Sequence, residues 1–337
     1  MKTLEATKLA DLAAALTAAG YRVIAPCQRG DQVHLECYQA GKTLRADVIP
    51  VNSAKDALFP RSEVIGRYRF EGNEFETVPA APQAGKTVLL AVRPCDAAAL
   101  APLDAVFNWD YKDEFYNAHR DATTVVALAC TAADDQCFCT SVGGSPDATA
   151  NADAVLRPAD GGKRFILEPL TDKGQAIAAA GQAVLTEAQS QADPPAQVAP
   201  AFDSAAVTAW AKDGFDSPLW KELSLACMGC GACAYTCPTC HCFDIQDEAT
   251  RREGVRLRNW DSCGFGLFTK HAGGHNPRHD QASRWRQRVM HKFAYFPERF
   301  EMLACTGCGR CGRLCGNGMS IREVCSQIEQ AAQAGAK

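Results

Sequence analysis

The stretch CMGCGACAYTCPTCHC, residues 227–242, decides how this chain is organised. Its first four cysteines follow the order C-x2-C-x2-C-x3-C and precede Pro238, which is the ligand run of a bacterial-type [4Fe–4S] cluster. Three thiols separated by two residues let one tight loop hold three corners of a cubane, and the glycines between them permit the backbone dihedrals of that loop. The run consists of Cys227, Cys230, Cys233 and Cys237.

A second run with the same spacing lies near the end of the sequence, in CTGCGRCGRLC. In two-cluster ferredoxins the last cysteine of each run ligates the other cluster. We therefore predict one cluster on Cys227, Cys230, Cys233 and Cys315, and another on Cys305, Cys308, Cys311 and Cys237. Gly316 stands where the pattern has proline, which predicts a slightly looser second site.

Zinc sites and disulfides fit these spacings less well than iron–sulfur clusters. A zinc ribbon needs two C-x2-C pairs with a longer spacer, whereas here four cysteines occur within eleven residues, twice. The 18 cysteines gather in metal-type spacings, which is typical of a reducing compartment rather than of a secreted disulfide framework. The first residues have no signal-peptide core, and no run has the length of a membrane span, so we expect a cytoplasmic, soluble protein without a membrane partner.

A third group of cysteines follows two apolar runs, TVLLAV at 87–92 and TVVALA at 124–129. A helical pattern between the runs predicts a βαβ unit in a parallel sheet, which places ligands at the carboxyl ends of its strands. Cysteines follow both runs at that edge, and a C-x-C pair lies just downstream. The sequence predicts a third [4Fe–4S] cluster on Cys95, Cys130, Cys137 and Cys139; the alternative is that some of these are core thiols.

The remaining patterns predict the domain organisation. We expect an α/β (α+β) domain with a short parallel βαβ unit over 1–188, a polar, proline-bearing linker over 189–200, and a largely helical two-cluster ferredoxin-like domain over 201–337. An insert, residues 238–304, separates the two cysteine runs. Within these parts we expect helices at 4–19, 171–188 and from 217, and strands at 21–25, 32–38 and 43–49.

The insert carries three further cysteines and an excess of basic residues. Cys240, Cys242 and Cys263 either ligate a further metal or shield and tune a neighbouring cluster, and we favour shielding because the two ferredoxin-type sets are already complete. The cations suit stabilisation of anionic clusters, or docking of an acidic partner surface, better than nucleic-acid binding. Three histidines, His271, His275 and His279, are expected to be loop and packing residues.

No fingerprint of a nucleotide site or of substrate chemistry stands out. The only GxGxxG, at Gly307, Gly309 and Gly312, is part of the second cysteine run and follows no strand. We therefore expect no flavin or nicotinamide on this chain, and we recognise no independent catalytic site. The sequence predicts a carrier of single electrons.

The whole set of motifs resembles one family. The blocks RPCD at 93–96, CFC at 137–139, CPTCHCFDIQD at 237–247, WDSC at 260–263 and AGGHNPR at 272–278 are similar to those of iron–sulfur beta subunits of cytoplasmic NAD(P)-linked nickel–iron hydrogenases (sulfhydrogenases) and of the iron–sulfur subunit of anaerobic sulfite reductase. The resemblance implies an electron-transfer subunit of an oxidoreductase complex. It would relay electrons between a flavoprotein subunit that handles NAD(P)H and a catalytic subunit, of hydrogenase, sulfite reductase or heterodisulfide-reductase type.

Two other functions remain open from the residues. In one, Cys240 and Cys242 act as a thiol pair that reduces disulfides beside a cluster. In the other, the chain is an iron–sulfur regulator that binds nucleic acid through the basic insert. The sequence leaves open which terminal enzyme is served, the direction of electron flow, the choice between NAD and NADP, and the cluster potentials.

Overall fold

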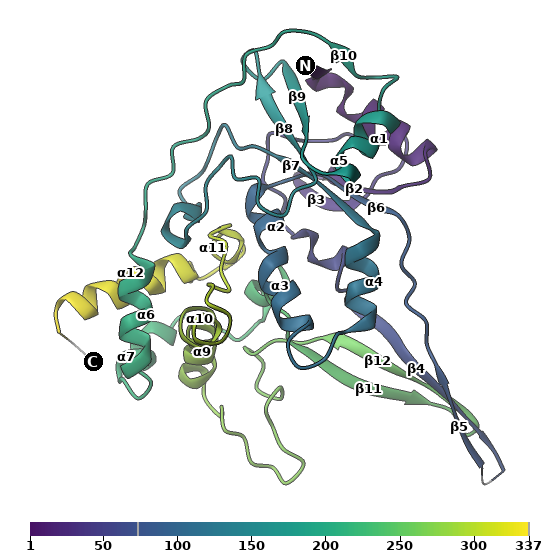
Figure 1. Ribbon diagram of the computed structural model, residues 1–337. Coiled ribbons are helices and arrows are strands. Elements are labelled where there is room, and N and C mark those ends of the chain that lie inside the picture. Colours follow the sequence, from purple (N-terminus) through teal and green to yellow (C-terminus); the bar gives the residue numbers. More distant parts are fainter. Residues whose placement is uncertain (73, 336–337) are drawn as a thin grey trace.

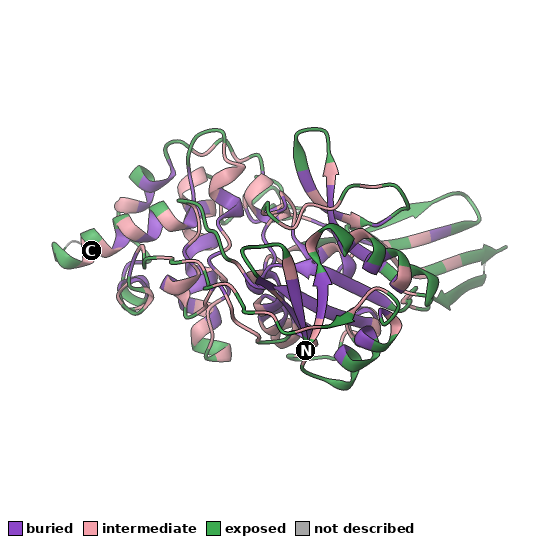
Figure 2. Cartoon of the chain, turned by 90° about the horizontal axis from the view of Figure 1, so that it is seen from above, coloured by how far each residue is buried: buried purple, intermediate pink, exposed green. Residues whose placement is uncertain are grey.

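The computed structural model describes residues 1–72 and 74–335 and contains a large mixed sheet at its N-terminal end (Figure 1). Its strands are β1 (Lys2–Glu5), β2 (Arg22–Arg29), β3 (Gln32–Cys37), β6 (Thr87–Val92), β7 (Thr123–Leu128), β8 (Ala154–Ala159), β9 (Arg164–Pro169) and β10 (Thr186–Glu187). They are ordered β10-β1-β9-β8-β7-β6-β2-β3, with β2, β6, β7 and β8 mutually parallel. Every residue of β6 and β7 is buried, because helices cover both faces of the sheet (Figure 2).

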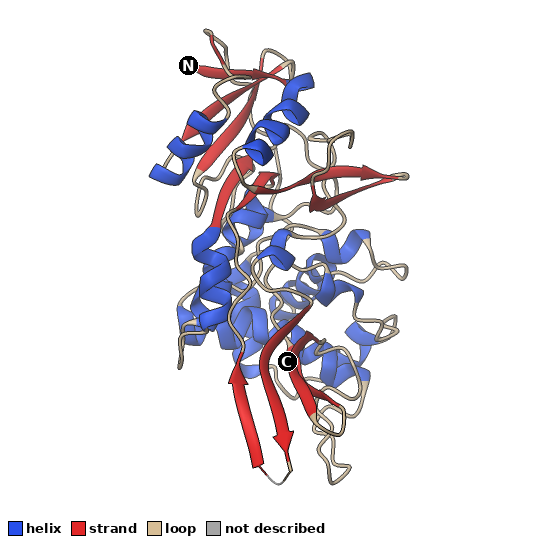
Figure 3. Ribbon diagram, turned by 90° about the vertical axis from the view of Figure 1, so that its right-hand side faces the viewer, coloured by secondary structure: helices blue, strands red, loops and turns tan. Residues whose placement is uncertain are grey.

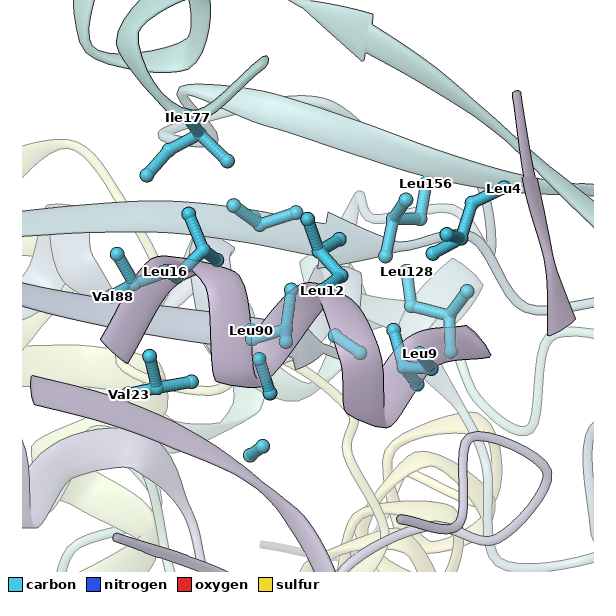
Figure 4. Close-up of a cluster of buried hydrophobic side chains, with 14 of the residues drawn as sticks. Leu4, Leu9, Leu12, Leu16, Val23, Val88, Leu90, Leu128, Leu156 and Ile177 are labelled. Atoms are coloured by element: carbon cyan, nitrogen blue, oxygen red, sulfur yellow. The ribbon is translucent and has the colours of Figure 1, made fainter. Parts of the chain in front are cut away.

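Helices pack on the two faces of this sheet. One face is covered by α1 (Leu9–Ala18) and α5 (Asp172–Ala180), and Figure 4 shows the leucines of α1 against the apolar side chains of the central strands. The other face is covered by α2 (Pro94–Ala98), α3 (Leu100–Phe107) and α4 (Glu114–Ala122). These three helices join β6 to the parallel strand β7, as the two apolar runs predict.

A second, four-stranded sheet forms an arm at the opposite end of the molecule from the N-terminus (Figure 3). It consists of β4 (Ser62–Glu71), β5 (Glu74–Pro79), β11 (Phe243–Ala249) and β12 (Glu253–Trp260), in the order β11-β12-β4-β5. The arm is anchored by the buried Arg258, which pairs with Glu63 at 2.6 Å and with Asp113. Because β12 comes from the insert and β4 from the N-terminal part, the sheet ties the two parts together.

The C-terminal part packs short helices around a core of its own. These are α6 (Ser204–Asp213), α7 (Leu219–Ser224), α8 (Ala232–Tyr235), α9 (Gln281–Met290), α10 (Phe296–Phe300), α11 (Arg310–Arg313) and α12 (Ile321–Gln333). A π-helical turn, His291–Tyr295, joins α9 to α10, and 3-10 turns occur at Ala6–Lys8, Ala54–Ala57 and Cys139–Val142. Among the described residues no helix combines the length and the apolar character needed to cross a bilayer.

Several sequence expectations are corrected by the structure. The first helix begins at Leu9 rather than at residue 4, because residues 2–5 pair with β9 as strand β1. No strand forms at 43–49, where Leu44 makes only an isolated bridge to Cys27. The helix expected over 171–188 ends at Ala180, before Gly181. The insert contributes two strands to the arm, so the description of the C-terminal part as largely helical is not confirmed.

Residues 189–200 form no helix and run along the N-terminal part. The carboxylate of Asp193 accepts hydrogen bonds from the N–H groups of Gly161 and Gly162, at 2.8 and 2.7 Å, and the Ala196 N–H donates to the Cys130 carbonyl at 2.8 Å. The segment is therefore held in place both by the Asp193 side chain and by its backbone. The domain division that the sequence places there stays a prediction.

Candidate iron–sulfur sites

The first cysteine run and the last cysteine of the second run enclose one cavity, which we call site I. Its wall contains Cys227, Cys230, Cys233 and Cys315, and its volume is about 80 Å³. The loop between α7 and α8 places Gly229 and Gly231 at φ of +70° and +73°. The Cys227 sulfur accepts a hydrogen bond from the side-chain amide of Gln281 at 3.0 Å. The structure thus groups the four cysteines as two-cluster ferredoxins do.

The first three cysteines of the second run, Cys305, Cys308 and Cys311, form site II together with Cys237, and this site is more deeply buried than site I. Burial raises the pKa of the Cys305 thiol to about 12, although the nearby Lys292 ammonium acts in the opposite direction. Cys237 contributes to the raised pKa of Cys305, Cys308 and Cys311, so all four thiols are neighbours. The pKa of Cys237 itself is lowered well below its usual value, by Cys240 first and then by the Lys292 and Arg288 cations. The Cys305 thiol is protonated at neutral pH, so binding a cluster there would release a proton.

The third group of cysteines lines a cavity of about 30 Å³, which we call site III. Cys95 lies in the first turn of α2, Cys130 follows β7, and Cys137 and Cys139 come from the loop beyond. All four line this cavity, at the carboxyl ends of β6 and β7. Arg313 of α11 donates a hydrogen bond to the Cys137 sulfur at 3.2 Å.

Sites II and III share a wall. Cys308 of site II also lines the cavity of site III. The Phe138 N–H donates to the Gly307 carbonyl at 3.0 Å, and a Cβ atom on Gly307 would lie only 2.5 Å from the backbone of Cys139. The GxGxxG pattern therefore has a packing role, since side chains at these positions would separate the two cysteine loops.

A buried ion pair fastens the same contact. The Arg310 guanidinium bonds both carboxylate oxygens of Asp96 at 2.7 and 2.8 Å, and each side chain is 1% exposed. Burial alone would lower the pKa of Arg310, but Asp96 and the neighbouring thiols raise it above its usual value. The pair joins the second cysteine run to α2, which carries Cys95.

Sites I and II are also neighbours. Cys311 of site II contributes to the raised pKa of Cys233 of site I, although burial is the main cause. The short helices that follow the two runs, α8 and α11, contact each other. The three sites therefore follow one another in the order I, II, III.

The three additional cysteines of the insert border these sites. Cys240 and Cys237 of site II are close enough that the pKa of Cys240 is raised and that of Cys237 lowered, and Cys263 and Cys242 shift each other's pKa in the same way. Cys263 also lines the cavity of site I. Cys240 and Cys242 are therefore paired with different partners rather than with each other.

Three cations are buried among these cysteines: Lys55, Arg288 and Lys292. The Lys292 ammonium lies 3.5 Å from the Cys237 sulfur, and the Arg288 guanidinium lies 3.4 Å from the Cys240 sulfur. Lys55 donates to the Cys240 carbonyl at 2.8 Å, and burial lowers its pKa to about 8. No ion pair to a carboxylate is found for any of the three in the described part of the chain. Burying a charge costs several kcal/mol, and an anionic cluster at the cysteines would offset that cost.

These observations fit the residues to iron–sulfur clusters. The cavities of sites I and III are each walled by the four proposed ligand thiols and one further cysteine, Cys263 in site I and Cys308 in site III, and the buried Nε of Arg288 has no hydrogen-bond partner. Within residues 1–72 and 74–335 no group of three His, Cys, Asp or Glu side chains converges as the ligands of a single metal ion would. The thiols of sites I and III line cavities, as the ligands of a multi-atom cluster would.

Sequence reasoning found the cysteines but missed part of their surroundings. Lys55 comes from the N-terminal part and lies in a short polar segment with no local sign of burial. Asp96 belongs to the RPCD block, but its partner Arg310 is 214 residues away. The other cysteines, Cys27, Cys37 and Cys325, lie outside all three sites, with Cys27 and Cys325 buried and Cys37 exposed.

Comparison with known proteins defines the class of this chain. Residues 226–319 match the family model described as a 4Fe-4S dicluster domain. With the geometry of the cysteines, this match supports an iron–sulfur electron-transfer subunit. The chain is also 28% identical over 311 residues to "Sulfhydrogenase 2 subunit beta" of Pyrococcus furiosus, covering 88% of this chain and 90% of that protein. The two matches confirm the resemblance to iron–sulfur beta subunits of the hydrogenase family. No solved structure matches this chain.

Proposed function

We propose that this chain is a three-site electron relay within a cytoplasmic oxidoreductase complex. A [4Fe–4S] cluster, when bound, gives and takes single electrons at a potential that its surroundings set. The proposed ligands are those of sites I, II and III. The observation that carries the proposal is their continuous order, in which Cys233 and Cys311 are neighbours and Cys308 lines site III.

The proposed partners are a flavoprotein subunit that handles NAD(P)H and a catalytic redox subunit. Support comes from the name of the Pyrococcus furiosus relative, which is a subunit of a sulfhydrogenase. A sulfite reductase or a heterodisulfide-reductase-type enzyme would use the same relay. The chain's own contribution is to hold the sites in a row and to supply the buried cations Lys55, Arg288 and Lys292, which stabilise added negative charge.

Iron and acid-labile sulfide per chain, measured on anaerobically purified protein, test the number of sites. Three cubanes correspond to about twelve irons, and two to about eight. We expect about twelve, falling by about four in Cys139→Ser and remaining unchanged in the control Cys37→Ser, whose thiol is exposed and outside every site. Zinc without sulfide would overturn the proposal.

For Cys240, Cys242 and Cys263 we propose shielding rather than ligation or disulfide chemistry. The pairing of Cys242 with Cys263, and of Cys240 with Cys237, speaks against a Cys240–Cys242 dithiol. Substitution Cys242→Ser should leave the iron content unchanged and shift the EPR spectrum of the reduced protein. Loss of iron would make Cys242 a ligand, and turnover of a disulfide that Cys240→Ala abolishes would favour the thiol reductase.

A further inference from the structure

The surface around the mouth of site I carries an unusual set of apolar side chains. Among the described residues only four large hydrophobic side chains are more than three-quarters exposed. Three of them are among, or close in sequence to, the residues that line this cavity: Leu225 at 83%, Met228 at 81% and Leu267 at 77%. Leu225 and Met228 border the first cysteine run, and Met228 lines the cavity beside the exposed Cys230. Such side chains are costly to leave in water, so their grouping at a redox site indicates a contact surface.

The loop that carries Leu267 is fixed against site I at both of its ends. This loop, residues 261–280, projects from the molecule between β12 and α9 (Figure 1). A Cβ on Gly231 would lie 2.4 Å from the ring of Phe265, so this ring packs directly on the first cysteine run. At the other end, Gln281 donates to the Cys227 sulfur. The loop therefore forms one rim of the mouth.

The charge of this rim is positive. The loop itself carries two cations, Lys270 and Arg278, and two acids, Asp261 and Asp280, and the start of α9 adds the cations Arg284 and Arg286. The Asp280 carboxylate caps α9 by accepting the Ser283 N–H at 2.8 Å, so its position is fixed at the helix end. Lys270 is exposed at the loop, and Arg284 lines the cavity itself. Three exposed histidines, His271, His275 and His279, add no negative charge.

We propose that this rim is the docking surface for a soluble, acidic, one-electron carrier protein, which meets the relay at site I. An apolar centre within a charged rim is the usual composition of a protein contact, and opposite charge speeds the encounter. Only three apolar side chains are offered, which suits the small interfaces of transient electron-transfer complexes rather than the large apolar contact of a permanent subunit. The proposal rests on the proposed relay and adds an entry point to it.

The test measures binding as well as electron transfer. The cluster-loaded full chain is titrated with a small two-cluster ferredoxin of net negative charge, and the Kd is measured by calorimetry in low and high salt. Raising the salt from about 0.05 to about 0.3 M should weaken binding by about tenfold or more, because the attraction is between exposed charges. The rate of reduction by that ferredoxin should fall in parallel.

Two variants locate the surface. We expect Lys270→Glu to weaken binding by about fivefold or more through charge reversal, and Leu267→Gln to weaken it with little change in salt dependence. The matched control is Lys163→Glu, an exposed lysine on the β8–β9 turn of the N-terminal sheet, which should leave Kd within about twofold. Reduction by dithionite should stay unchanged in all three.

The outcomes separate this proposal from the relay. If iron is present and dithionite reduces it, but Kd depends neither on salt nor on Lys270, the docking surface is wrong and the relay stands. An equal effect of Lys163→Glu would also overturn the proposed location. If the chain binds no iron, the relay itself fails.

Discussion

In the first cysteine run Gly229 and Gly231 have φ of +70° and +73°, and in the second run Gly307 and Gly309 have +65° and +73°. The two loops therefore follow the same backbone path, and each leads into a single helical turn. Their surroundings differ. The first loop leaves Cys230 exposed at a cavity mouth, whereas the second is pressed against the loop of site III.

The residue after the second glycine of each run carries this difference. It is Ala232 in the first run and Arg310 in the second, where it forms the buried pair with Asp96. Identical spacing thus specifies how cysteines wrap a cluster, while the residues between the cysteines specify what the loop packs against. The first run forms the end of the row and the second forms its middle.

The largest loss of stability is expected when Arg310 of the second run is replaced by alanine, the residue at the equivalent position of the first run, Ala232. Arg310→Ala would leave the Asp96 carboxylate buried without its partner, which typically costs about 3–5 kcal/mol. Thermal unfolding under anaerobic conditions measures the loss. The control is Arg256→Ala, which removes an exposed pair with Asp247 and should cost far less stability, because water screens that pair. Equal losses in the two variants would mean that the buried pair does not hold the sites together.

Alanine substitutions at equivalent glycines should destabilise the protein to different extents in the two loops. Gly307→Ala and Gly229→Ala share the strain of a positive φ, about 1–2 kcal/mol. A Cβ on Gly307 meets the Cys139 backbone at 2.5 Å, but on Gly229 it meets the end of the Gln281 side chain at 3.2 Å. We expect Gly307→Ala to cost about 1–3 kcal/mol more. Denaturant midpoints measure this, and a larger loss in Gly229→Ala would contradict the packing argument.

Removing a cation should distinguish the buried site from the exposed one. Lys292 is buried beside Cys237, whereas Arg284 lies at the open cavity of site I. A nearby cation stabilises the extra negative charge of a reduced cluster, so Lys292→Met should lower the midpoint potential, on the order of 100 mV. Arg284→Met should lower it less, because water screens that charge. Redox titration followed by EPR measures both shifts, and a rise in potential in Lys292→Met would refute the argument.

The smallest effect is expected from making the ends of the two runs alike. Gly316 replaces the proline found after Cys237, its φ is not positive, and a Cβ there would meet nothing within 4 Å. Gly316→Pro should therefore stabilise the protein by up to about 1 kcal/mol, by restricting the unfolded chain. A destabilisation of that size would show that the exit of the second run needs glycine.

Local patterns predicted the elements whose signals are strong. The cysteine spacings grouped the residues of sites I and II, and the uninterrupted apolar runs at 87–92 and 124–129 gave β6, β7 and the edge where site III lies. These features can be predicted from short stretches of sequence because metal ligation and full burial both restrict which residue types occur there.

The arm was not predicted, because its strands depend on distant partners. Strand β11 is exposed at every residue, and β4 alternates too weakly to reveal a buried face. Lys55 gave no signal either, since lysine is rarely buried and its sulfur neighbours lie about 185 residues further along. Long-range pairing and charge burial are properties of the folded chain rather than of a sequence window.

The division of each ferredoxin-type site between two distant runs has a consequence for biosynthesis. Site I takes Cys315 from the second run, and site II takes three of its cysteines from there. A nascent chain that has emerged only as far as residue 304 therefore offers neither site its full set of thiols. With the proposed ligand sets, iron and sulfide can complete these two sites only after Cys315 has emerged, and a transcript cut short before Cys305 yields a chain that can mature neither of them.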